Sequence, residues 1–493
     1  MSSQRKGPHL VLEADWLLPI SGRPIASGAV AIDGDRIAAV GTAAELRARY
    51  GTMPPDSDLE WRSFPGCAIL PGLINAHSHL DYSAFLGFSR PMGFGRWMLR
   101  LLLARRRLAT ADYALSAGWG AQECLRNGVT CVADTSFEGW TAARAAGEAG
   151  LRALVYLEVF GLDEGSVPEI MARTETRLSE LESCAGPLID LGLSPHAPYT
   201  VSWRLFREIS RYAAREHLPI ATHVAESAAE VEFLERGTGS IARAYRSARL
   251  LQGRRWTAPG LAPVAYLASA GTLGTTTLAV HCVHLQQDDI QVLAGTGTSV
   301  AHCPRSNDYL RCGIAPVVQM RASDVKVALG TDSLASNTSL DMFEEMRAAL
   351  AASQSAAQLG SGTTAPLAPT DVLRMATIEA AGALGRAHDL GSLEAGKLAD
   401  LMVLALPPRA SLAGSGASTL APGPPDNGSP DDVDVLEPLI VRKSRGRDVQ
   451  ATIVAGALVF ERSRESLSED SASLHGLEEL RRKLGLDAMR HNL

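Results

Sequence analysis

Short apolar runs alternate with amphipathic stretches rich in Ala, Arg, Leu and Glu along the middle of the chain. Eight runs have the length and composition of buried strands: 67–74, Val129–Asp134, Arg152–Val159, Leu188–Pro195, Pro219–Val224, Thr276–His281, Thr298–Cys303 and Val325–Gly330. Eight strand–helix units predict an α/β fold, a TIM-type (β/α)8 barrel, and about 320 residues suffice for one with insertions. The alternative, a doubly wound open sheet, requires a glycine-rich phosphate loop after its first strand, and Pro71–Asp81 is not one.

The two ends of the chain have a different pattern, with short strands separated by turns. Strands are expected at His9–Pro19, at Gly28–Val40 with a hairpin turn at Asp33-Gly34-Asp35, at Gly391–Leu406 and at Asp448–Glu461. Neither end looks like a complete sheet alone, so we predict one small β-sandwich domain formed from both chain ends. Its halves are residues 1–68 and 391–462, and the barrel between them spans residues 69–390.

Three further segments complete the expected organisation. A short helix is expected at Ala43–Tyr50. Residues 407–434 are rich in Pro, Gly, Ser and Asp, a composition that predicts a mobile loop. Residues 463–493 are expected to form a helical tail, with its helix at Ser473–Leu484.

Composition and charge narrow the class of protein. Of the 493 residues, 46% are hydrophobic and 20% are charged, which is an ordinary mix for a soluble globular protein. The net charge of −7 makes nucleic acid an unexpected partner. Apolar runs stay below the roughly 18 residues of a membrane span, and no signal-peptide core is recognisable, so we expect a cytoplasmic protein. The seven cysteines lack C-x-x-C spacing, which favours reduced thiols.

Most histidines directly follow the predicted strands. Seven of the twelve lie at strand ends: His77, His79, His196, His223, His281, His284 and His302. Four other polar residues occupy similar places: Glu226, Ser306, Asn307 and Asp332. Because barrel active sites form at the carboxyl ends of the strands, these side chains are expected to meet at one rim. A single histidine is more often structural than functional, but seven at one rim favour a site.

Four of these residues form a ligand set suited to one catalytic metal ion. His77 and His79 are spaced i, i+2, so both point to the same side of a strand. With His223 and Asp332 they supply three neutral imidazoles and one carboxylate, which zinc and iron(II) accept in catalytic sites. The resulting positive centre can activate water as a nucleophile. Two alternatives remain open, a solvated loop for the histidine pair and a helix N-cap for Asp332.

Three residues are candidates for proton transfer. Asp332 is suited to accept the proton of the attacking water. Glu226 follows His223 by three residues and is suited to protonate a ring nitrogen or a leaving group, with an exposed loop carboxylate as the alternative. His281 is expected to face inward and hold the water, while His284 points to the other side.

The strand-end motifs resemble those of the amidohydrolase superfamily, and within it the nucleoside-deaminase and triazine-hydrolase group. They are P-G-L-I-N-A-H-S-H-L, S-P-H-A-P-Y-T, T-H-V-A-E-S, H-C-V-H-L, H-C-P-R-S-N and L-G-T-D-S. The resemblance implies one metal ion on the four ligands proposed above, because the bridging lysine of two-metal members is missing. It also implies proton transfer by Glu226 and His281 and substrate contact by His196. Three residues after the seventh strand are further candidates for substrate contact: His302, Ser306 and Asn307.

The first loop carries conflicting substrate signals. H-S-H-L-D-Y-S is similar to the corresponding stretch of aminodeoxyfutalosine deaminases, whereas S-P-H-A-P-Y-T resembles adenosylhomocysteine and methylthioadenosine deaminases. The latter typically carry an F-E-E-W-like element whose glutamate holds ribose hydroxyls. Here G-F-G-R-W keeps Trp97, but Gly95 and Arg96 replace the acids. Trp97 is expected either to lie over a purine ring or to be a core aromatic of the helix at 97–108.

The basic stretch beside this loop has two interpretations. A solvated helix face is favoured, and binding of a substrate carboxylate is the alternative. The arginines concerned are Arg90, Arg96, Arg100 and Arg105–Arg107.

We therefore expect a metal-dependent hydrolytic deaminase of an aminated purine nucleoside or a similar small molecule. Aminodeoxyfutalosine and adenosine derivatives such as S-adenosylhomocysteine are the favoured substrates, and Zn2+ is the favoured ion, with Fe2+ and Mn2+ as alternatives. One rival function is a chlorohydrolase or aminohydrolase of a triazine or another heterocycle. A rival of another class is a non-catalytic binding protein on the same fold. The sequence is compatible with a homo-oligomer.

Overall fold

The barrel predicted from the eight apolar runs is present. The computed structural model describes residues 8–51, 59–248, 257–359, 365–407, 430–463 and 471–486. Its barrel strands are β6 (Leu73–Ser78), β7 (Val129–Ser136), β8 (Arg152–Val159), β9 (Ile189–Pro195), β10 (Ile220–Val224), β11 (Thr277–His281), β12 (Ser299–His302) and β13 (Val327–Leu329). They are parallel and neighbours in sequence order, which excludes the doubly wound alternative. The two ends of this sheet meet where the Asp332 amide donates to the His77 carbonyl oxygen at 3.0 Å.

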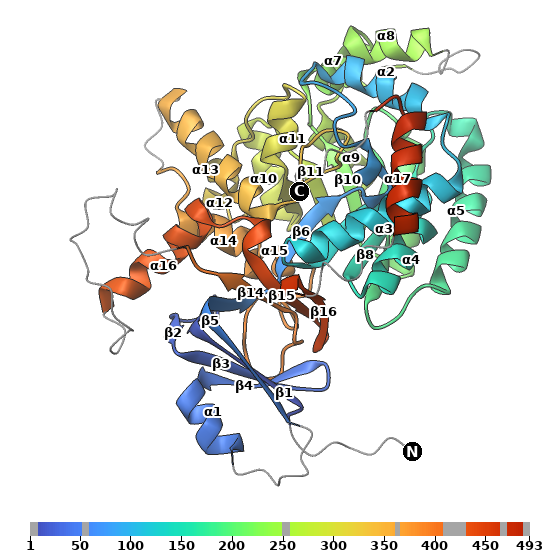
Figure 1. Ribbon diagram of the computed structural model, residues 1–493. Coiled ribbons are helices and arrows are strands. Elements are labelled where there is room, and N and C mark those ends of the chain that lie inside the picture. Colours follow the sequence, from blue (N-terminus) through green and yellow to red (C-terminus); the bar gives the residue numbers. More distant parts are fainter. Residues whose placement is uncertain are drawn as a thin grey trace.

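Helices surround the barrel, as Figure 1 shows. Those after β6, β7 and β8 are α2 (Phe94–Arg105), α3 (Thr110–Arg126), α4 (Trp140–Ala149) and α5 (Val167–Glu182). Those between β9 and β12 are α6 (Trp203–Arg215), α7 (Ala228–Arg236), α8 (Gly239–Ser247), α9 (Pro263–Ala270) and α10 (Gln287–Thr296). The remainder around the barrel are α11 (Pro304–Tyr309), α12 (Val317–Ala322), α13 (Met342–Leu359), α14 (Pro369–Met375) and α15 (Ile378–Ala383).

The second domain is a mixed sheet built from both ends of the chain and lies below the barrel in Figure 1. Its strands are β1 (Leu10–Leu17), β2 (Ile25–Ala26), β3 (Gly28–Asp33), β4 (Arg36–Thr42), β5 (Glu60–Pro71), β14 (Leu401–Ala405), β15 (Val449–Val454) and β16 (Ala457–Glu461). The order is β16-β15-β14-β5-β1-β3-β4, with β2 beside β1. Leu12 and Val30 from the first half share one buried cluster with Val403 and Ile453 from the second. The helix α1 (Ala43–Tyr50) packs on this sheet, as expected.

The expected first barrel strand, 67–74, is wrong as a single strand. Residues up to Pro71 belong to β5, which pairs with β14, and the barrel strand β6 begins at Leu73. Gly72 lies where the chain crosses from one sheet to the other. A larger residue would not fit there, because a Cβ atom would lie 2.0 Å from the Thr130 hydroxyl oxygen. The apolar pattern continues through Gly72 since both strands are buried, so it could not reveal the change of sheet.

The C-terminal region contains more helix than expected. Of the predicted mobile loop, residues 408–429 lie outside the described residues, and the helix α16 (Pro430–Lys443) begins inside its last part. The tail contains α17 (Ser471–Lys483), close to the expected helix, while residues 464–470 and 487–493 lie outside the described part. Among the described residues, every helix is too short or too polar to cross a lipid bilayer. All seven cysteines are free.

Candidate metal centre and active site

The four proposed metal ligands converge at the carboxyl ends of the barrel strands. His77 lies on β6 and His79 directly after it, His223 lies on β10, and Asp332 follows β13. The Oδ1 atom of Asp332 is 3.6 Å from the Nε2 atoms of both His77 and His79. The Nε2 atoms of His79 and His223 are 3.3 Å apart. All four side chains are buried, so none lies on a solvated loop.

These side chains fit a divalent metal ion. His77 Nε2 is buried and has no hydrogen-bond partner among the described residues, although it faces the other ligand atoms. Burial lowers the pKa of His79 to about 3 and that of His223 well below its usual range, so both imidazoles are neutral at pH 7. Burial opposes ionisation of Asp332, but the surrounding imidazoles hold its pKa well below the usual range. Neutral imidazoles and an ionised carboxylate are the forms that bind metal.

Neighbouring groups orient the ligands. The carbonyl oxygen of His196 lies 2.9 Å from His223 Nδ1, which assigns the proton to Nδ1 and leaves Nε2 free for the metal ion. The hydroxyls of Ser306 and Ser336 donate to Oδ2 of Asp332 at 2.5 and 2.6 Å, and Oδ1 remains toward the histidines. These contacts fix the carboxylate in its observed rotamer.

Glu226 and His281 lie together beside the proposed ligands. His281 Nε2 is 3.7 Å from Glu226 Oε1, and both side chains are buried. Burial raises the pKa of Glu226 well above its usual range, and the nearby Asp332 and Glu230 carboxylates add to this. Burial lowers the pKa of His281 to about 4. A carboxyl group whose environment favours its protonated form and a neutral imidazole therefore lie beside the centre, which suits a proton donor beside an acceptor.

An unusual backbone turn directs His281 into the site. Leu278 and Val280 on β11 face the barrel interior, so strand alternation alone would point His281 outward. Instead His281 has a φ of 72°, and the Cys282 amide donates to the Val280 carbonyl oxygen at 3.1 Å, which closes a γ-turn. Asp332 also has a positive φ, 57°. Strained residues of this kind often occur where a side chain must be aimed at a functional site.

A hollow of about 50 Å³ lies beside the centre and next to a larger cavity of about 430 Å³. Both are lined by Trp97, Leu101, Arg105, His196 and Tyr199. The imidazole of His196 stacks on Phe160 with ring centroids 4.7 Å apart. The Trp97 indole donates to the Ala335 carbonyl oxygen at 2.9 Å. The larger volume lies within the range that small-molecule sites occupy.

The comparison with known proteins decides the family. The amidohydrolase family profile matches residues 68–459, most of the chain. The chain belongs to the amidohydrolase family. A short stretch, 28–51, also matches the bacterial imidazolonepropionase-like composite domain, within the mixed sheet.

Named relatives of this amidohydrolase are deaminases. It is 34% identical over 476 residues to the 5-methylthioadenosine/S-adenosylhomocysteine deaminase of Syntrophobacter fumaroxidans, and the match covers 94% of each chain. It is 34% identical over 342 residues to the aminodeoxyfutalosine deaminase of Deinococcus radiodurans, covering 68% of this chain and 79% of that protein. The crystal structure of an adenosine deaminase from Xanthomonas campestris with bound zinc superposes with a TM-score of 0.77 at 26% identity, covering 97% of this chain and 98% of that one.

Three residues of the amidohydrolase site have positions other than those expected. His302 does not line the hollow, because Ala301 on β12 faces the barrel interior and His302 points outward, toward Val317 and Ala349. Ser306 donates to Asp332, and Asn307 Oδ1 lies 3.0 Å from His281 Nδ1. These last two residues orient other side chains, and neither lines the cavity.

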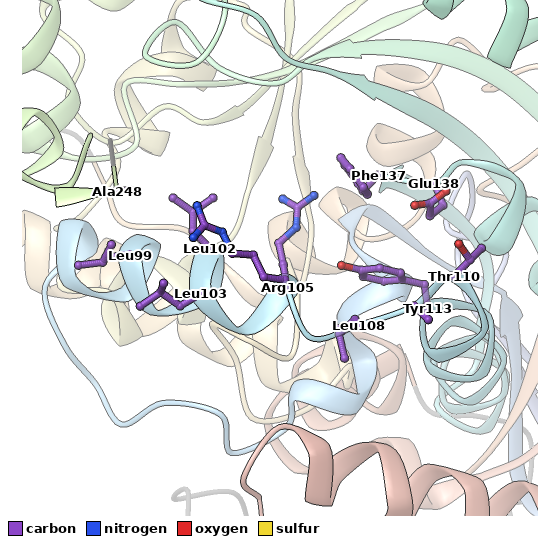
Figure 2. Close-up of a pocket in the computed structure, with 12 residues that line it drawn as sticks. Leu99, Leu102, Leu103, Arg105, Leu108, Thr110, Tyr113, Phe137, Glu138 and Ala248 are labelled. Atoms are coloured by element: carbon purple, nitrogen blue, oxygen red, sulfur yellow. The ribbon is translucent and has the colours of Figure 1, made fainter. Parts of the chain in front are cut away.

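One charged residue of this amidohydrolase site was not expected from the sequence, and a second, Arg105, was placed at the site only as the alternative. Glu158 on β8 is 2% exposed and lines the hollow. Arg105 was expected on a solvated helix face, but its guanidinium lies 4.2 Å from the Phe137 ring centroid and lines the hollow as well. It also borders a neighbouring cavity of about 400 Å³, which Figure 2 shows along α2. Arg90, Arg96, Arg100, Arg106 and Arg107 are exposed, as expected.

Proposed function

We propose that the protein is a metal-dependent hydrolytic deaminase that releases ammonia from an aminated purine nucleoside. The observation that carries the proposal is the pairing of a fitting metal centre with Glu226 and His281 at one end of a nucleoside-sized cavity. The relatives described above are deaminases of 5-methylthioadenosine/S-adenosylhomocysteine and of aminodeoxyfutalosine, which supports an adenosine derivative or aminodeoxyfutalosine as substrate. Because the similar Xanthomonas protein holds zinc, we favour Zn2+ as the ion.

The side chains divide the reaction among them. A bound divalent ion would supply Lewis-acid activation of a water molecule. Asp332 accepts the proton of the attacking water, and protonated Glu226 delivers a proton to the ring nitrogen beside the amino-bearing carbon. His281 holds the water in line with that carbon. Attack forms a C–O bond and gives a tetrahedral carbon. The hydroxyl proton then returns to Glu226, the proton on Asp332 passes to the amino group, and the C–N bond breaks to release ammonia.

Binding of the base is assigned to the cavity wall. The flat rings of Trp97 and Phe160 offer surfaces for a purine, and His196 lies between Phe160 and the metal centre. Phe160 lines the larger cavity next to Gly161 and Leu162. These residues would orient the ring with its amino-bearing carbon toward Asp332.

The proposal is tested by ammonia release from metal-loaded protein. The panel contains aminodeoxyfutalosine, S-adenosylhomocysteine, methylthioadenosine, adenosine, guanine and a chlorotriazine. We expect strong turnover of at least one adenine nucleoside and little of the triazine. Release of chloride without ammonia would support the triazine alternative, and tight binding without any product would support a non-catalytic binding protein. A cytoplasmic location and a homo-oligomeric state remain predictions.

A further inference from the structure

Glu158 is a buried acid on the interior face of the barrel. On β8, Leu154 and Tyr156 face the interior, while Val155 and Leu157 pack outside, so alternation places Glu158 on the interior side. It stands at the carboxyl end of the strand and lines the same hollow as Glu226 and Asp332. It is therefore part of the wall that a substrate would touch.

The Glu158 carboxyl group lacks the partners that a buried acid normally has. Its Oε2 atom is buried without a hydrogen-bond partner among the described residues, and Oε1 lies 3.8 Å from His196 Nε2. Burial raises its pKa to about 8, although the positive charge of Arg105 opposes this. Asp81 provides a contrast, because its two oxygens accept hydroxyl hydrogen bonds from Ser136 and Thr141. A buried acceptor without a donor is costly, which suggests that a ligand supplies the donor.

The position of Glu158 indicates which part of a ligand it meets. It projects from the third strand, and Arg105 and Trp97 reach the hollow from α2, whereas Glu226 and His281 follow the fifth and sixth strands. A base held between the metal centre and Glu226 therefore extends its substituent toward Glu158 and Trp97. The first turn of α2 contains no acidic residue, so a hydrogen-bond acceptor for that substituent is not supplied there.

We propose that Glu158 accepts hydrogen bonds from the sugar hydroxyls of the nucleoside and thereby selects ribonucleosides. This inference rests on the proposed function for the identity of the ligand. Arg105, packed against the Phe137 ring and close to Phe160 and Tyr82, keeps a positive charge beside the carboxyl group. That charge opposes the effect of burial on the Glu158 pKa, and the carboxyl group offers hydrogen-bond acceptors in either protonation state.

The test compares two ligands that differ only in the sugar hydroxyls. Calorimetry measures binding of inosine and of 2′,3′-dideoxyinosine to zinc-loaded protein, because these products are not consumed during the measurement. The variants are Glu158→Leu, which removes the acceptor, and Glu158→Gln, which keeps a weaker one. Glu235→Gln is the matched control, since Glu235 is an exposed residue on α7.

The expected result is a loss of sugar selectivity confined to Glu158. The unsubstituted protein and Glu235→Gln should bind inosine about 10- to 100-fold more tightly than its dideoxy analogue, the range for leaving a buried polar group without its hydrogen-bond partner. Glu158→Leu should reduce this ratio to about 2-fold or less, with Glu158→Gln between the two. An unchanged ratio in Glu158→Leu, or no preference for inosine in the unsubstituted protein, overturns the inference. If the unsubstituted protein prefers inosine but releases no ammonia from any nucleoside of the panel, the result would instead count against the proposed function.

Discussion

The Asp332 carboxylate depends on two serine hydroxyls that hold its Oδ2 atom. Ser306→Ala removes one of them, so we expect metal affinity to fall by about 10- to 100-fold, as for other groups that orient metal ligands. The measurement is a chelator competition that yields the metal dissociation constant. Ser355→Ala, an exposed position on α13, is the control and should leave the constant unchanged. Equal affinities for Ser306→Ala and the control would contradict the orienting role.

Glu345 makes stability depend on pH. It accepts a hydrogen bond from Asn337 at 2.7 Å, and Asn337 also donates to the Thr331 carbonyl oxygen next to Asp332. Burial raises the pKa of Glu345 to about 8. At pH values between the pKa of Glu345 in the unfolded chain and its folded value, the folded state holds one more proton than the unfolded state. As pH rises through this range, Glu345 therefore lowers the unfolding free energy by up to about 1.4 kcal/mol per pH unit.

The test is Glu345→Gln, which removes the titrating group. Denaturant unfolding at several values between pH 5 and pH 8 should show the variant gaining stability relative to the unsubstituted protein as pH rises. Glu235→Gln, an exposed position on α7, should show no such trend. A stability difference for Glu345→Gln that is the same at every pH would refute the assignment.

The sequence could predict which residues belong to the site where those residues lie at the ends of the predicted strands. The motif histidines and Asp332 could be assigned to one rim because barrel strands end there. Motif spacing could not show that Ser306 donates to Asp332 and that Asn307 lies beside His281. His302 follows plain strand alternation and points outward, whereas the γ-turn at His281 departs from it.

The helix α17 braces the segment that follows the metal-binding histidines. Arg481 donates to the carbonyl oxygens of Ala84 and Leu86 at 3.1 and 2.8 Å. Leu480 is 1% exposed and packs in one cluster with Tyr82 and Phe85. The C-terminal helix is thus connected to the loop that carries His79.

We expect Leu480→Ala to lower the unfolding free energy by about 2–4 kcal/mol, because it leaves a cavity in this cluster. Hydrogen exchange should also speed up in residues 80–85, and metal affinity should fall. Leu103→Ala is the control, since Leu103 is 51% exposed, and it should change stability by less than about 0.5 kcal/mol. Unchanged exchange in residues 80–85 would show that α17 does not brace the loop.

Hydrophobic periodicity predicted which segments are strands but not which sheet each strand joins. The run 67–74 crosses from one sheet to the other at Gly72, and both parts are equally apolar. The strand β8 is apolar on both faces, so periodicity could not show that Glu158 faces the interior. Arg105 could not be assigned in this way, because its aromatic neighbours come from separate loops and strands.

A buried ion pair connects the barrel to the mixed sheet. Arg152 on β8 donates to Asp400, directly before β14, at 2.8 and 3.0 Å, and both residues are buried. Asp400→Asn leaves the arginine charge uncompensated, so we expect a loss of about 3–5 kcal/mol in unfolding free energy. Asp389→Asn breaks the pair with half-exposed Arg36 and should cost about 1 kcal/mol or less. Similar losses in both variants would contradict a structural role for the buried pair.

The order of elements along the chain was enough to predict the whole-molecule plan. Incomplete strand sets at both ends and eight repeated units between them correspond to the mixed sheet and the barrel. The pairing of Arg152 with Asp400 could not be predicted from the order of elements, because the two residues are 248 positions apart and no periodic pattern connects them.

We propose that ammonia release depends on a metal ion held by Asp332 and the three histidines. The most direct test measures release from the best nucleoside of the panel before chelation, after chelation and after zinc is restored. We predict that activity disappears with the metal and returns with it, and that Asp332→Asn remains folded but nearly inactive at every step. Full activity in the chelated protein, or in Asp332→Asn, would show that the reaction does not depend on this metal centre.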